Sequence, residues 1–193
     1  AILCISSCNN EDKTKDVLAG DKQTVNTAEP IWTDMSPPPL SLMLDGVFLS
    51  EKIGIMTGEK TWRTEDGGKT WKEAFPDGFW CLAFADAEVG YACGGAWANA
   101  PGLVYKTTDG GASWKKIFEG PIGLTSIAVS GNNIVAGSPW RCASIWRSAD
   151  AGAAWSEVSG AGGDIHSIIS TGKDSFLALN LAGSLCRSTD GGA

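Results

Sequence analysis

One short pattern recurs along this chain, and its spacing limits the folds that the chain can adopt. The pattern is a serine or threonine, an aspartate two residues later, a glycine two residues after that, and a tryptophan five residues after the aspartate. Four copies occupy residues 64–71, 107–114, 148–155 and 188–193, the last without the tryptophan. The aspartates are 43, 41 and 40 residues apart, a period that fits one four-stranded β-sheet per repeat.

Each copy is typical of a tight turn between two strands. The aspartate can accept hydrogen bonds from backbone N–H groups across the turn, glycine allows positive φ, and the tryptophan can fold beneath the turn as a plug. A catalytic or calcium-binding role is the alternative, but a catalytic group is seldom needed four times. We therefore expect structural roles for these residues: Asp66, Trp71, Asp109, Trp114, Asp150, Trp155 and Asp190.

Between the turns, the chain consists of short segments rich in β-branched and aromatic residues, which favour strands. In the second repeat we expect strands at 80–84, 89–93, 103–107 and 114–117, running from the innermost outward. Residues 125–129 and 166–169 are expected to be the next two innermost strands. No segment has a helical period. The sequence therefore predicts an all-β fold.

The pattern resembles the Asp box, or BNR repeat, of sialidases, sortilin-type receptors, xyloglucanases and the photosystem II stability/assembly factor group. The short repeats here are most similar to those of the assembly factors. The resemblance covers residues 31–193 and implies a β-propeller of four-stranded blades with Asp-box hairpins. About three and a half blades are expected, as part of a six- to eight-bladed ring. Residues 31–37 parallel 70–76 and are expected to form an outermost strand.

The first 30 residues have the features of a targeting segment. Residues 1–8 are expected to be the end of a signal peptide, and Ile5-Ser6-Ser7-Cys8 resembles a lipobox in which Cys8 is acylated. An ordinary cleaved signal peptide with an incidental cysteine is the alternative. Residues 9–30 are expected to be a polar tether. These features predict a bacterial outer-membrane lipoprotein, periplasmic or surface-exposed, held at the membrane only by its lipid anchor.

Charge and cysteine usage exclude several classes of ligand. The net charge of -7 argues against a nucleic-acid partner, which would need clustered basic residues. With a single histidine and no closely spaced cysteines, we expect no metal site and no cofactor. Four cysteines follow the targeting segment, and they either remain buried thiols or pair in one of three ways. They are Cys81, Cys93, Cys142 and Cys186.

Non-repeating residues are expected at the end of the blades opposite the boxes. Trp97, Trp140 and Arg141 lie in loops between second and third strands, with Trp80 and His166 at the same level. Such residues suit a sugar ring or a peptide carboxylate. Alternatively, the tryptophans pack between blades, Arg141 is a solvated rim residue, and His166 has no evident partner for base catalysis. The basic residues that precede each box aspartate by three positions, Arg63, Lys106, Arg147 and Arg187, are expected to be structural.

These observations favour a non-catalytic envelope module that binds a protein or glycan ligand. A sortilin-like peptide receptor belongs to the same hypothesis. The alternative is a glycoside hydrolase of sialidase-like or xyloglucanase-like type, with its catalytic groups in sequence beyond residue 193. A sialidase should carry an Arg-Ile-Pro motif and a Tyr–Glu pair, but the motif is absent and neither Tyr91 nor Tyr105 adjoins a glutamate.

Overall fold

The described residues form fifteen strands and no helix. The computed structural model describes residues 42–94, 100–139, 145–158 and 164–193, all within the unit Ser36–Ala193. Within these ranges, no helix is long and apolar enough to span a membrane. The expected lipidation site Cys8, the polar tether and the expected strand at 31–37 lie outside the described residues.

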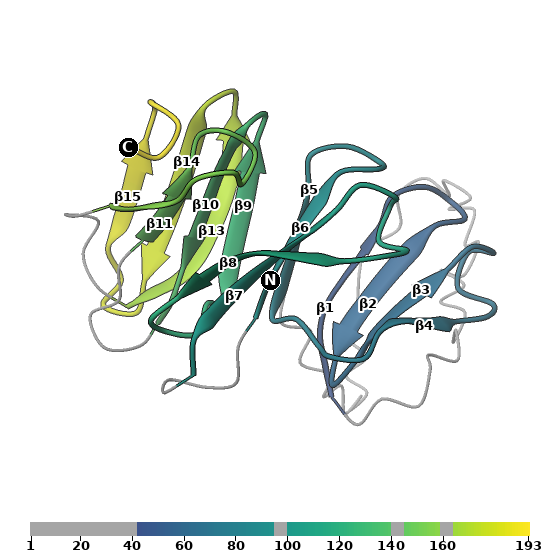
Figure 1. Cartoon of the computed structure of the whole chain (residues 1–193). Helices are drawn as coiled ribbons and strands as arrows, with labels where there is room; N and C mark the ends of the chain where they lie inside the picture. Colours follow the sequence, from purple (N-terminus) through teal and green to yellow (C-terminus); the bar gives the residue numbers. More distant parts are fainter. Residues whose placement is uncertain (1–41, 95–99, 140–144, 159–163) are drawn as a thin grey trace, which may run out of the picture. The chain divides into compact units, whose positions relative to one another are not determined.

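The strands form four antiparallel sheets in which sequential strands are neighbours, as a propeller blade requires (Figure 1). The first three blades have four strands each, and the described part of the fourth has three. Blade 1 is β1(Met43–Phe48), β2(Gly54–Gly58), β3(Thr61–Thr64) and β4(Lys72–Phe75); blade 2 is β5(Cys81–Phe84), β6(Gly90–Gly94), β7(Gly102–Thr107) and β8(Lys115–Gly120); blade 3 is β9(Ser126–Ser130), β10(Asn133–Gly137), β11(Ile145–Ser148) and β12(Ser156–Val158); blade 4 is β13(Ile165–Gly172), β14(Ser175–Asn180) and β15(Leu185–Ser188).

This architecture confirms the predicted all-β propeller of four-stranded blades. The predicted strands of the second repeat correspond to β5–β8, with ends that differ by up to three residues. Trp114, predicted to lie in a strand, instead precedes β8, because its side chain is buried beneath the turn.

The apolar core lies between successive blades. One cluster joins Tyr91, Cys93 and Val104 of blade 2 to Ile127 and Ile134 of blade 3. A second cluster joins blades 3 and 4 in the same manner. Each sheet therefore buries a face against the sheet beside it, so the stability of a blade depends on its neighbour.

Equivalent positions on the innermost strands add polar links between blades. The Asp45 carboxylate on β1 accepts a hydrogen bond from the Leu82 backbone N–H on β5, at 2.8 Å. The Ser126 hydroxyl on β9 accepts one from Ile168 N–H on β13, also at 2.8 Å. Cys81 holds the corresponding place on β5, and its thiol lies 3.8 Å from the Ile127 carbonyl oxygen of blade 3.

Candidate functional site

Each Asp box is a closed hydrogen-bonded turn. In the second box, the Thr107 hydroxyl donates to Asp109 at 2.7 Å and accepts from Gly111 N–H at 2.9 Å. The same Asp109 oxygen also accepts from Ser113 N–H at 2.9 Å, and the other carboxylate oxygen accepts from the Ser113 hydroxyl at 2.5 Å. The first box repeats this arrangement, and the third keeps all of it except the hydroxyl that Ala154 lacks.

These hydrogen bonds hold the box aspartates in the ionised form. The side-chain and backbone hydrogen bonds from Thr70, together with that from Thr64, lower the pKa of Asp66 to about 2. Burial is the largest single influence on the pKa of Asp109 and raises it, but the hydrogen bonds from Ser113 and Thr107 together lower it. A carboxylate that is held ionised by hydrogen bonds from its own turn is poorly suited to act as a general acid, which supports the structural role.

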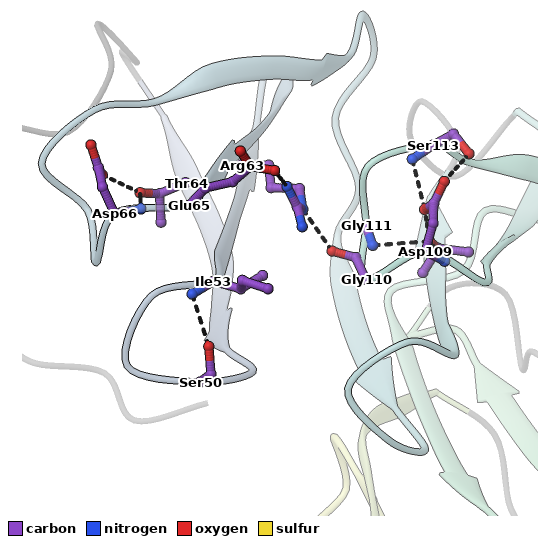
Figure 2. Close-up of polar contacts among 11 residues, drawn as sticks. Ser50, Ile53, Arg63, Thr64, Glu65, Asp66, Asp109, Gly110, Gly111 and Ser113 are labelled. Carbon is purple, nitrogen blue, oxygen red and sulfur yellow. Dashed lines mark hydrogen bonds and ion pairs between the residues drawn. The ribbon is translucent and has the colours of Figure 1, made fainter.

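In blades 2, 3 and 4, the residue after the box aspartate is bonded in two directions. Its N–H donates to the turn between the first two strands of its own blade, as Gly110 does to the Glu88 carbonyl at 2.9 Å. Its carbonyl, here called the box carbonyl, accepts from the basic residue of the preceding blade. Figure 2 shows this bond between Arg63 and Gly110, with Nε 2.9 Å from the oxygen.

The same inter-blade bond recurs along the described chain. Lys106 of blade 2 donates to the Ala151 box carbonyl at 3.1 Å, and Arg147 of blade 3 donates to that of Gly191 at 2.6 Å. This confirms that the regular spacing of basic residues is structural. Arg187 holds the equivalent place on β15 and is exposed, and its side chain makes no hydrogen bond or ion pair with any residue in the described ranges.

Replacing Arg147 with methionine is expected to lower the free energy of unfolding by about 1.5–3 kcal/mol, because hydrogen bonds to a charged donor are lost. The bonds at stake are those to the Gly191 carbonyl and to the Asn133 side chain. Urea denaturation monitored by circular dichroism would measure the change. The matched control, Arg187→Met, should change the free energy of unfolding by less than about 0.5 kcal/mol. Equal losses in both variants would contradict the inter-blade role.

The box tryptophans occupy the plug position, to different depths. Trp114 is 9% exposed, and its ring lies 5.1 Å from that of Phe79 and 6.1 Å from that of Phe84. Trp71 and Trp155 are half-buried, and each donates its indole N–H to a glycine carbonyl of its own box, at 3.1 and 3.2 Å.

Two of the predicted ligand residues, Trp80 and His166, lie at the other end of the blades. Trp80 is half-buried just before β5, where its backbone N–H donates a hydrogen bond to the Cys93 carbonyl near the end of β6. His166 is exposed near the start of β13, after Asp164, whose carbonyl accepts from Leu181 N–H. Trp97, Trp140 and Arg141 lie outside the described residues, so their assignment to a binding site remains a prediction. Cys142 also lies outside the described residues.

Within the described ranges, no group of three or more His, Cys, Asp or Glu side chains is placed to hold a metal ion. Cys81, Cys93 and Cys186 are thiols. Sequence reasoning did not identify Asp45 and Ser126 as links between blades, because unlike residues occupy that repeat position and leave no pattern.

Four consecutive antiparallel sheets, each carrying an Asp box, define an Asp-box β-propeller protein. The family model of the photosynthesis system II assembly factor YCF48 matches residues 24–192, and the chain belongs to this family. No curated protein matches the chain in sequence.

Solved structures with this fold include both binding proteins and enzymes. A structure of YCF48 bound to D1 peptide is 23% identical, with a TM-score of 0.57, over 75% of this chain and 50% of that one. YCF48 from Cyanidioschyzon merolae is 18% identical, with a TM-score of 0.56, over 79% and 55%. The GH74 xyloglucanase from Xanthomonas campestris is 17% identical, with a TM-score of 0.66, over 83% and 31%. The chain spans between 31% and 55% of the length of these structures, and the likeness shows the fold alone.

Proposed function

We propose that this chain is a non-catalytic, assembly-factor-like propeller that binds a segment of a partner protein at the end of its blades opposite the Asp boxes. Membership of the YCF48 family is the observation that carries the proposal. A structure of YCF48 itself holds a D1 peptide. A peptide is therefore a ligand class that this kind of propeller accommodates.

The distribution of polar groups supports this end of the blades as the binding surface. At the box end, the carboxylates, hydroxyls and box carbonyls are occupied by hydrogen bonds that hold the turns and join the blades. The opposite end carries Trp80, Asp164 and His166 at the starts of innermost strands, where the sequence does not repeat. Aromatic side chains, together with the sequence-predicted ligand residue Arg141, would suit an extended peptide that carries a carboxylate.

A glycoside hydrolase is the second candidate, favoured by the fold shared with an ancestral GH74 enzyme and a GH74 xyloglucanase. Such an enzyme needs two carboxyl groups facing each other across the bond to be cleaved. Asp164, at the end of blade 4 opposite its Asp box, would supply one of these carboxyl groups. Asp45 is less suited to supply the other, because one of its carboxylate oxygens already accepts a hydrogen bond from Leu82 N–H.

Binding can be tested with the D1 peptide that the relative binds, labelled with a fluorophore and titrated by anisotropy. We expect saturable binding to the full chain. Joint replacement of Trp97, Trp140 and Arg141 by alanine should weaken it at least tenfold without changing the circular dichroism spectrum. A matched variant replaces three exposed lysines of the box end, Lys52, Lys69 and Lys173, and should bind normally.

Two results would overturn the proposal. If both triple variants weakened binding equally, the peptide would bind elsewhere on the chain or be held only by charge attraction. Release of reducing sugar from xyloglucan, with no peptide binding, would identify the chain as a hydrolase.

A further inference from the structure

Two cysteines face each other across the first two strands of blade 2. Cys81 on β5 is the direct antiparallel partner of Cys93 on β6, so both side chains project from the same face of the sheet. They pack against each other in the core between blades 2 and 3. Directly opposed residues have Cβ atoms about 4.5–5.5 Å apart, and a disulfide needs about 3.5–4.5 Å. A bond between them therefore requires a small approach and no change of register.

The two thiols differ in access and in acidity. Cys93 is fully buried, and burial raises the pKa of its thiol well above the usual value. Cys81 is partly exposed, and the hydrogen bond from the Cys93 thiol lowers its pKa. Cys81 is therefore the sulfur that ionises first and that a reagent can reach, which is the arrangement of an attacking and a resolving thiol.

We propose that Cys81 and Cys93 form a redox site, in which a disulfide-bearing oxidant converts the dithiol to a cross-strand disulfide. The Cys81 thiolate attacks one sulfur of the oxidant, breaks its S–S bond and releases one thiolate, leaving a mixed disulfide. Cys93 then loses its proton and attacks the Cys81 sulfur, which expels the second thiolate of the oxidant. The two cysteines lose two electrons and two protons, and the oxidant is reduced to two thiols.

The register selects this pairing among those that the sequence leaves open. Cys186 lies on β15 in blade 4 and belongs to a different core cluster. Oxidation would also remove the hydrogen of the Cys81 thiol, whose sulfur lies 3.8 Å from the Leu82 carbonyl oxygen and 3.8 Å from the Ile127 carbonyl oxygen of blade 3. The redox state of this site would thus alter a contact between blades 2 and 3.

The proposal can be tested by mass spectrometry of the full chain after incubation with oxidised glutathione. No lysine or arginine separates residues 73 and 106, so both cysteines lie in one tryptic peptide. We expect this peptide to lose the mass of two hydrogen atoms, and the loss to reverse with dithiothreitol. Cleavage after Glu88 should then leave two fragments still joined by the disulfide.

Matched variants distinguish the site from general thiol oxidation. Cys186→Ser should retain the mass loss in peptide 73–106. Cys93→Ser should stop the reaction at a Cys81–glutathione adduct, because the resolving thiol is absent. The proposal fails if peptide 73–106 of the unsubstituted chain keeps both thiols, or if Cys81 is found bonded to another cysteine.

Discussion

Truncation of Trp114 to alanine is expected to lower the free energy of unfolding by about 3–5 kcal/mol, the largest loss of any single change considered. The indole is 9% exposed and packs on Phe79, which connects blade 1 to blade 2, and on Phe84 of β5. Removing it would leave a cavity between two blades that neither sheet can close alone. Urea denaturation monitored by intrinsic fluorescence and circular dichroism would measure the loss.

The matched comparison is Trp71→Ala, at the same box position in blade 1. Trp71 is half-buried, and its described aromatic neighbour is Phe48, at 6.3 Å. Its truncation should cost clearly less than that of Trp114, because less surface is buried. A larger loss of stability in Trp71→Ala than in Trp114→Ala would show that the burial of a box tryptophan does not determine its contribution to the free energy of unfolding.

Replacement of Gly111 by alanine is expected to cost about 2–5 kcal/mol, although it adds a single methyl group. Gly111 has φ +80°, a region that costs an L-residue about 1–2 kcal/mol. An added Cβ would lie 2.7 Å from Ile55 Cγ1 of blade 1, and overpacking of this kind costs about 1–3 kcal/mol. The measurement is the urea midpoint at constant m-value.

Gly131 provides the control for backbone strain alone. It also has positive φ, at +56°, but an added Cβ meets no atom within 4 Å. Gly131→Ala should therefore cost about 1–2 kcal/mol at most. Ile55→Ala removes the atoms that the new methyl group would meet, so the double variant should lose less stability than the sum of the two single changes. Strict additivity would exclude the clash as the cause.

The boxes were predictable from sequence because their chemistry is local. A hydroxyl, an aspartate and a glycine at fixed spacing form the same turn wherever they occur, as the first two boxes show bond for bond. Ala151 tests the limit of the pattern, since it keeps φ at 57° where the other boxes have glycine. Only the spacing of the basic residues indicated the inter-blade bond, because its acceptor is a backbone carbonyl and has no side-chain signature.

Long-range features could not be predicted in the same way. Asp45, Cys81 and Ser126 share one position on the innermost strands, but their side chains differ, so no repeat is visible in the sequence. Cys81 and Cys93 are separated by a turn, and only the strand register shows that they are opposed. The end of the blades opposite the Asp boxes carries residues that differ from one repeat to the next. Comparing the repeats with one another therefore does not indicate the roles of these residues.

The bonds from the basic residues to the box carbonyls all point in one direction along the chain. Arg63, Lys106 and Arg147 each donate to a backbone carbonyl more than 40 residues further on. During synthesis, the donor of every such bond therefore leaves the ribosome before its acceptor. Each completed blade carries a basic side chain whose acceptor, the box carbonyl, forms only in the next blade. The propeller is therefore suited to assembly one blade at a time from the N-terminus.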